Sequence, residues 1–199
     1  MTRVLFIRHG RTSWNDEKRI QGHTDIPLSD AGRAELRARR LPREYRRWQV
    51  YASPLKRAVE SSRLLGLENP LLDPRLMEMR YGDWEGATWP ELKSKYGDAL
   101  IQRGLKGLDF RPDGGESPRE LKARLGSWLE EVASLQRDCV AVSHKGIIRM
   151  ALALATGWDL VSKAPARLMW DHGHLFSLSA GEPGVSVRIS ALNVALGPP

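Results

Sequence analysis

The stretch VLFIRHGRTSWN, residues 4–15, decides how the rest of this chain is interpreted. Four apolar residues, Val4 to Ile7, predict a buried strand because both of its faces would be apolar. Arg8, His9, Gly10 and Arg11 follow at once. A buried strand does not normally end in two cations and a histidine unless something negative is bound there. We therefore expect an anion-binding site directly after this strand.

The composition is that of a globular protein. The chain has 199 residues, of which 41% are apolar and 28% charged, and this length fits a single domain spanning residues 1–199. Its only cysteine, Cys139, excludes an internal disulfide and lies in an apolar strand pattern, which predicts a buried thiol in a reducing compartment. We expect a cytoplasmic protein.

Two classes of partner are not expected. The net charge is +7, but the arginines around residues 37–47 have the pattern of a solvated helix face, without a nucleic-acid-binding motif beside them. The most apolar run, Gly146 to Ala155, is interrupted by Arg149 and is too short to span a bilayer. The sequence thus predicts no nucleic-acid partner and no membrane partner.

Strand and helix patterns alternate along the chain. Strands are expected at Val4–Ile7, 49–52, 139–142, 174–179 and 185–190, and helices from Ser29 to about Leu41, from Ser53-Pro54 to about Gly66, after the capping box at 117–120, and at 147–155. Residues 71–116 break this alternation with scattered prolines, glycines and two short helical patterns, at 89–96 and 98–105. We expect an α/β sandwich with a largely parallel sheet and a lid-like excursion over about 75–116.

Three of the expected strands end in residues that bind anions. Ile7 leads into Arg8 and His9, residue 52 into Ser53 and Arg57, and residue 142 into His144. Ligands of open α/β sheets bind beyond the carboxyl ends of the strands, so these side chains are expected to converge there. Two guanidiniums and two imidazoles near helix N-termini predict a phosphate site.

Two histidines indicate more than phosphate binding. With His9 as a nucleophile, the group becomes a site for phosphoryl transfer through a phosphohistidine. The surrounding cations should lower the pKa of His9 and keep it neutral near pH 7. The leaving oxygen then needs a proton from a carboxylic acid. Spacing alone leaves Glu78, Asp83 and Glu85 as candidates.

Six blocks in this chain resemble the histidine phosphatase superfamily, also called phosphoglycerate mutase-like, and in particular its phosphatase branch with α-ribazole and broad-specificity phosphatases. They are Arg8–Asn15, Gly22–Gly32, Ser53–Ala58, Gly82–Gly86, Gly114–Ser117 and Ser143–Gly146, in the family's order. The resemblance implies a three-layer α/β sandwich, with a mostly parallel mixed sheet flanked by helices on both faces. It implies no metal and no other cofactor, and dimers are common among relatives.

The resemblance also implies roles for single residues. His9 matches the phosphorylated nucleophile, and Glu78 matches the proton donor. Arg8, Arg57 and His144 match the residues that hold the phosphoryl group, Asn15 matches a side chain placed on the phosphate, and Thr24 lies in a loop that borders the substrate. Lys145 stands where relatives commonly have glycine; with Arg11 it is a candidate partner for a further anionic group on the substrate. The roles of Glu85, Glu116, His172 and His174 stay open.

Three functions are compatible with these residues. The first is hydrolysis of a small phosphate ester without metal, the second is cofactor-dependent phosphoglycerate mutase activity, and the third is an inactive phosphate-binding module. Mutases resemble this chain but carry a longer insertion with paired arginines, whereas residues 87–113 are short and lack an adjacent Arg-Arg pair. A short lid favours hydrolysis, because water enters more readily. The physiological substrate cannot be read from the sequence.

Overall fold

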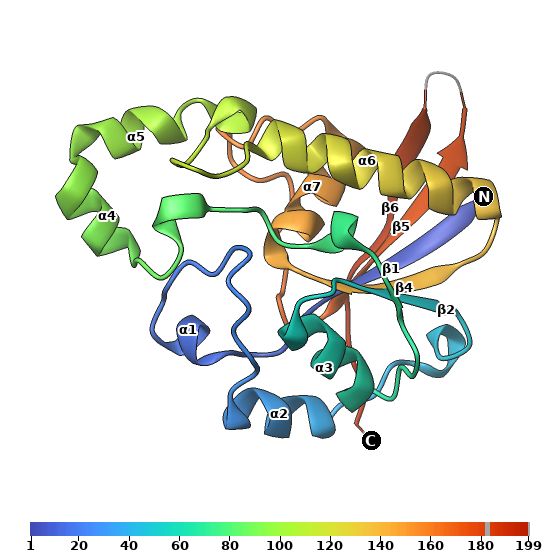
Figure 1. Ribbon diagram of the computed structural model, residues 1–199. Helices are drawn as coiled ribbons and strands as arrows, with labels where there is room; N and C mark the ends of the chain where they lie inside the picture. Colours follow the sequence, from blue (N-terminus) through green and yellow to red (C-terminus); the bar gives the residue numbers. More distant parts are fainter. Residues whose placement is uncertain (182–183, 199) are drawn as a thin grey trace.

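The computed structural model describes residues 1–181 and 184–198, and its centre is a six-stranded sheet (Figure 1). The strands are β1 (Thr2–Arg8), β2 (Gln49–Ala52), β3 (Leu71–Leu72), β4 (Cys139–Ser143), β5 (Gly173–Ala180) and β6 (Val185–Val194). The helices are α1 (Ser13–Asp16), α2 (Asp30–Arg37), α3 (Lys56–Leu64), α4 (Trp89–Tyr96), α5 (Asp98–Gly104), α6 (Pro118–Leu135) and α7 (Lys145–Thr156). Four short 3₁₀ helices are η1 (Arg43–Tyr45), η2 (Pro74–Leu76), η3 (Gly82–Trp84) and η4 (Gly107–Asp109).

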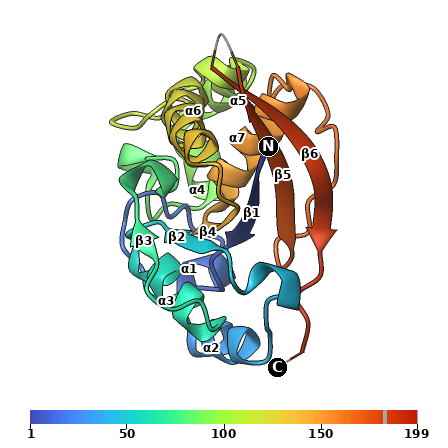
Figure 2. The same cartoon turned by 90° about the vertical axis from the view of Figure 1, so that its right-hand side faces the viewer.

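The sheet is mixed, and its order is β3-β2-β4-β1-β5-β6. β3, β2, β4 and β1 run parallel to one another, whereas β5 pairs antiparallel with β1 and β6 pairs antiparallel with β5. Figure 2 shows helices on both faces of this sheet. The expected α/β sandwich with a mostly parallel mixed sheet is confirmed. No helix in the described ranges is long and apolar enough to cross a bilayer.

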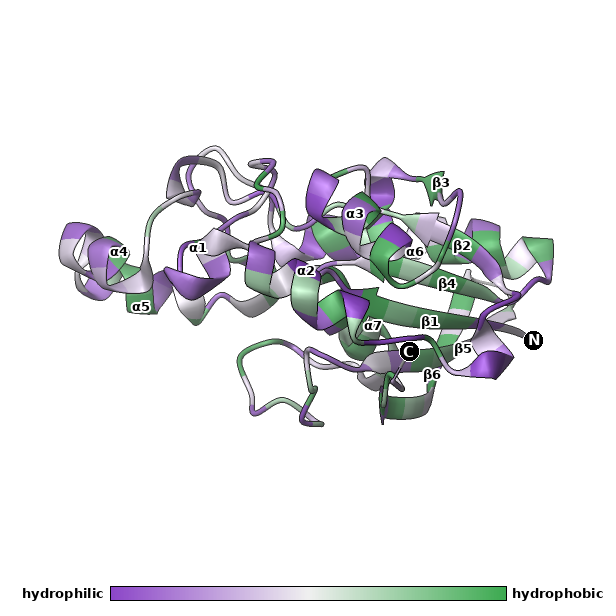
Figure 3. Ribbon diagram, turned by 90° about the horizontal axis from the view of Figure 1, so that it is seen from below, coloured by the Kyte–Doolittle hydropathy of each residue, from purple (hydrophilic) through white to green (hydrophobic). Residues whose placement is uncertain are grey.

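The strands at the centre of the sheet bury both faces. Successive side chains of a strand point to opposite faces, so Val4 and Phe6 pack with α6 and α7 while Leu5 and Ile7 pack with α2 and α3. β4 is buried at all five positions. Figure 3 shows β1 and β4 as hydrophobic ribbons. This double burial explains why the sequence patterns of these strands are continuous rather than alternating.

The excursion after β3 forms a small structure with its own core. Trp84 and Leu92 are buried together with Ile20, and the rings of Tyr96 and Phe110 lie 5.6 and 5.3 Å from the Trp84 ring. α4 and α5 follow the two helical patterns read from the sequence. In Figure 1 these two helices lie at one end of the molecule, beyond α1.

Two helix boundaries differ from the sequence-based expectation. α2 ends at Arg37 rather than near Leu41, because Arg40 leaves the helix to exchange backbone hydrogen bonds of 2.8 and 2.9 Å with Gly197. α3 begins at Lys56 with Leu55 as its N-cap residue, so Ser53 does not cap it. The two-residue strand β3 had no signal in the sequence.

Candidate active site

The ends of β1, β2 and β4 form one edge of the sheet, and backbone hydrogen bonds continue past the strands there. The N–H of His9 donates to the Ser143 carbonyl at 2.9 Å, and the N–H of Ser53 donates to Val142 at 3.0 Å. His144 follows directly after β4. The sheet therefore places residues 9, 53 and 144 beside one another although they are far apart in sequence.

His9 is held as a neutral imidazole. Its Nδ1 lies 2.7 Å from the Gly10 carbonyl oxygen. A carbonyl can only accept, so Nδ1 carries the hydrogen and Nε2 keeps its lone pair. The pKa of His9 is well below its usual range, first because the ring is buried, and further because Arg8 and Arg57 are close. This leaves an unprotonated Nε2 at neutral pH.

His144 is fully buried beside His9, with 5.0 Å between the two ring centroids. Its Nε2 lies 2.8 Å from the Ser53 hydroxyl, which also accepts a 3.3 Å hydrogen bond from the N–H of Leu55. Its Nδ1 is buried without a hydrogen-bond partner among the described residues. Burial, followed by the charges of its neighbours, lowers the pKa of His144 as well. A buried polar atom without a partner is costly, so Nδ1 is available to a ligand.

Arg57 is fully buried, and its guanidinium is fixed by a loop from the first part of the chain. It donates to the Thr24 and Gly22 carbonyls at 2.9 and 2.7 Å. Glu85 holds that loop in turn, since it accepts from the N–H groups of His23 and Thr24 at 3.0 and 2.7 Å. These contacts assign Glu85 a structural position: it orients the loop that orients Arg57.

Gly22 is required where Glu85 meets this loop. It has φ of +57°, and a Cβ there would lie 2.0 Å from Glu85 Oε1. Only glycine combines that backbone conformation with such close approach of a carboxylate.

Glu78 lies at the N-terminus of α7. Its Oε1 accepts from the N–H of Met79 at 2.8 Å and from that of Gly146 at 3.0 Å, while Oε2 makes only a 3.2 Å contact to Gly146. A Cβ on Gly146 would approach Oε1 to 2.1 Å, so glycine at 146 lets the carboxyl reach this position. Oε2 is therefore the less engaged oxygen of the two.

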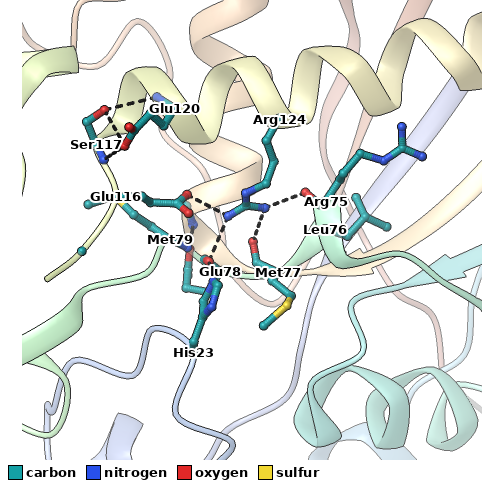
Figure 4. A network of polar contacts seen from close by, with 12 residues as sticks. His23, Arg75, Leu76, Met77, Glu78, Met79, Glu116, Ser117, Glu120 and Arg124 are labelled. Carbon is teal, nitrogen blue, oxygen red and sulfur yellow. Dashed lines mark hydrogen bonds and ion pairs between the residues drawn. The ribbon is translucent and has the colours of Figure 1, made fainter.

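The backbone before Glu78 is irregular, and Arg124 of α6 braces it (Figure 4). Its guanidinium donates to the carbonyls of Arg75 at 2.6 Å, Met77 at 2.9 Å and Glu78 at 3.1 Å. Glu116 pairs with the same guanidinium at 2.8 Å. These contacts place Glu116 and Arg124 behind Glu78 rather than in the cavity.

A cavity of about 640 Å³ joins these groups to the excursion. The predicted residues that line it are Arg8, His9, Asn15, Arg57, Glu78 and Lys145. Its apolar and aromatic lining includes Trp14, Ile20, Met79, Tyr81, Trp89, Phe110, Leu121, Met150 and Leu160. This is room for an organic group beside a phosphate.

Three predicted residues lie outside the cavity lining: Arg11, Thr24 and His144, whose ring is buried 5.0 Å from that of the lining residue His9. Arg11 pairs with Asp16 and Glu35 on the surface. A contact between Arg11 and a substrate stays a prediction. Thr24 does not line the cavity either; its hydroxyl donates to Glu85, and its carbonyl is used by Arg57.

Asn15 combines a structural contact with a place in the cavity wall. Its Oδ1 accepts from Thr12 N at 3.1 Å in the capping box of α1, which leaves its amide NH₂ for a ligand.

The two histidines left open by the sequence have structural positions. His172 pairs with Asp171 at 2.9 Å, and neither His172 nor His174 lines the cavity. His174 is buried in β5, and burial lowers its pKa to about 4.

Sequence reasoning missed Arg124 and Arg149 as residues of this region. Arg149 follows Lys145 by one helical turn, and that spacing was the available signal.

Comparison with known proteins agrees with this geometry. The profile of the family described as histidine phosphatase superfamily (branch 1) matches residues 4–189. The chain belongs to this superfamily. It is 36% identical over 155 residues to phosphoglycerate mutase-like protein 4 of Arabidopsis thaliana, covering 73% of this chain and 67% of that protein. It is 32% identical over 174 residues to glucosyl-3-phosphoglycerate phosphatase of Mycolicibacterium vanbaalenii, covering 78% and 74%.

A solved structure supports the fold. Mycobacterial glucosyl-3-phosphoglycerate phosphatase with VO3 superposes with a TM-score of 0.76 over 98% of this chain and all of that one, at 24% identity. Together with the phosphatases among its relatives, the superfamily membership makes this chain an enzyme of the phosphatase type. The narrower resemblance to α-ribazole phosphatases stays a prediction.

Proposed function

We propose that this protein hydrolyses small phosphate monoesters without a metal ion, through a phosphohistidine on His9. The observation that carries the proposal is the neutral His9 ring, with Nδ1 tied to a carbonyl and two arginines beside it. An uncharged Nε2 is a nucleophile, and fixed cations stabilise the charge on a phosphoryl group in transfer.

In the first step, the Nε2 lone pair of His9 attacks phosphorus as the bond from phosphorus to the ester oxygen breaks. Glu78 gives its proton to the departing oxygen, with Oε2 as the oxygen that carries it. Arg8, Arg57 and the Nδ1–H of His144 hold the phosphoryl oxygens, and the Asn15 amide adds a further donor.

In the second step, water attacks the phosphohistidine and gives a proton to the Glu78 carboxylate. The bond from phosphorus to nitrogen breaks, and its electron pair returns to Nε2. Both steps thus use one acid–base group in opposite directions.

The positions of the lysines and arginines of the lid, residues 87–113, favour hydrolysis over mutase activity. Arg103 of α5 pairs with Asp113 at 3.1 Å, and Lys93, Lys95 and Lys106 do not line the cavity. A mutase must hold a doubly charged product in place until the phosphoryl group returns to another hydroxyl. Among the described residues, no lysine or arginine of the lid (residues 87–113) lines the cavity to perform that task.

The test is turnover of p-nitrophenyl phosphate with and without EDTA. We expect activity that the chelator leaves unchanged, lost in His9→Ala and kept in His172→Ala, a matched change of a histidine outside the cavity. Rapid quenching of the wild type should recover an acid-labile phosphate on His9. Interconversion of phosphoglycerates on addition of 2,3-bisphosphoglycerate, without hydrolysis, would instead identify a mutase. Inertness in both assays would leave a binding module.

A further inference from the structure

Two cations of α7 line the cavity without a role in the steps above. Lys145 and Arg149 are one helical turn apart, so they lie on the same face of the helix. Both line the cavity that also contains His9 and Glu78. The phosphoryl group already has Arg8, Arg57 and two histidines around it, so this pair is surplus to phosphate binding alone.

The position of this pair is unfavourable for the helix itself. Like charges at this spacing repel, and a cation in the first turn of a helix opposes the helix dipole. Neither side chain forms an ion pair with a carboxylate in residues 1–181 or 184–198. By contrast, Arg19 in the same cavity wall pairs with Glu17 at 2.6 Å. Within the described residues, the folded chain thus gives neither Lys145 nor Arg149 a carboxylate in ion-pair contact.

Aromatic rings hold both head groups in place. Lys145 Nζ lies 5.0 Å from the centre of the Trp170 ring, and the Arg149 guanidinium lies 5.0 Å from that of Trp158. A stacked ring orients a cation but leaves its hydrogen-bond donors free. Burial, then the charges of Arg149 and Arg8, lower the pKa of Lys145, against the opposing charge of Glu78. A second anion would relieve this repulsion.

We propose that Lys145 and Arg149 form a second anion-binding subsite, and that the physiological substrate is a phosphate monoester whose organic part carries another anionic group. The inference rests on the proposed function for the phosphoryl end of the cavity. A carboxylate or a second phosphate supplies the same chemistry. The apolar lining formed by Phe110, Leu121 and Leu160 would contact the carbon skeleton.

The experiment compares esters that differ only in the second charge. The pairs are 3-phosphoglycerate with glycerol 3-phosphate, and 4-carboxyphenyl phosphate with phenyl phosphate; 1,3-propanediol bisphosphate tests a second phosphate. We expect kcat/KM to be at least about tenfold higher for the doubly anionic member of the better pair. Lys145→Met and Arg149→Met should each remove most of that ratio and leave the singly anionic ester within about twofold. Lys93→Met, a lid lysine outside the cavity lining, should leave the ratio unchanged.

Binding without turnover separates this inference from the proposed function. Thermal shifts are measured with 3-phosphonopropionate and with propylphosphonate, which hold a phosphonate that cannot be hydrolysed. Stronger stabilisation by the carboxylate-bearing compound, lost in Lys145→Met, supports the subsite even if no ester is hydrolysed. Equal effects of the variants on both members of each pair would overturn the subsite while leaving hydrolysis intact. Equal kcat/KM for both members in the wild type would overturn it as well.

Discussion

The two halves of the candidate site are built in different ways. The phosphoryl half stands on strand ends, where the backbone ladder of the sheet positions His9 and His144. The half that contains the proposed acid Glu78 lies on a segment without regular secondary structure. Side chains from other elements hold this segment in place, chiefly Arg124. The sheet places groups by cooperative backbone pairing, whereas the acid half depends on a few side-chain contacts. Single substitutions should therefore separate the two halves.

The largest effect is expected from Glu78→Gln. It removes the proton donor, so kcat/KM on an alkyl phosphate such as glycerol 3-phosphate should fall by about 10²–10⁴-fold. p-Nitrophenolate leaves without a proton, so p-nitrophenyl phosphate should be affected far less in the first step. The measurement is kcat/KM for both esters, which reports the first step and not the hydrolysis of the phosphohistidine that both esters share, with Glu44→Gln on η1 as a matched control. Equal losses of kcat/KM on the two esters would show that Glu78 does not act on the leaving group.

Glu85→Gln should impair the phosphoryl-binding half of the site, although Glu85 itself lies in the excursion. Its amide NH₂ would face the N–H donors of His23, Thr24 and Tyr81, and the loop that fixes Arg57 would shift. A displacement of about 1 Å at a positioning group can cost up to about 10²-fold in rate. We expect kcat to fall alike on both esters and inorganic vanadate to inhibit less tightly.

The exposed neighbour Asp83 provides the control for this change. Asp83→Asn alters a carboxylate of the same 3₁₀ segment and should leave vanadate inhibition as in the wild type. If Glu85→Gln changes the alkyl ester alone, its effect passes through Glu78 rather than through Arg57.

A smaller loss, about tenfold, is expected for Arg124→Met. Three backbone carbonyls around Glu78 would lose their donor, but the Gly146 and Met79 amides would still hold the carboxyl. The loss should appear on alkyl esters, with vanadate inhibition unchanged. Arg119→Met, on the exposed side of the same helix, is the control. Weaker vanadate inhibition in Arg124→Met would mean that the two halves are not independent.

The smallest effect concerns stability and pH. His9, His144 and His174 are buried with lowered pKa values, so the unfolded chain binds more protons than the folded chain below about pH 6.5. Stability is therefore full above that pH and is lost as pH falls, by up to about 1.4 kcal/mol per pH unit for each such histidine. We expect Tm to decrease between pH 6.5 and 5, where most carboxylates are still ionised.

His174→Leu should flatten that slope, since it removes one of the three buried rings without changing His9 or His144. His172→Gln, which changes a histidine that is not one of these three buried rings, should leave the slope as it is. A Tm that stays constant from pH 6.5 to 5 in the wild type would contradict the assignment of these rings as neutral.

The sheet was predictable because its signals are local. Continuous apolar runs marked β1, β2 and β4, and the capping box at Ser117 marked the start of α6. Two features that the sequence did not predict correctly have identifiable physical causes. Ser53 has the pattern of a helix cap, but its hydroxyl contacts His144, a residue 91 positions away. β3 is two exposed leucines, too short to produce a periodic pattern.

The sequence by itself determined the chemistry at the strand ends, since parallel strands bring their carboxyl ends to one edge whatever the loops between them do. Only the tertiary structure decided what surrounds that edge. It paired Arg11 with Glu35, linked Glu85 to Arg57 through Gly22, and left Lys145 and Arg149 facing the cavity. Those outcomes depend on contacts between elements distant in sequence, and neither spacing nor hydrophobic periodicity encodes such contacts.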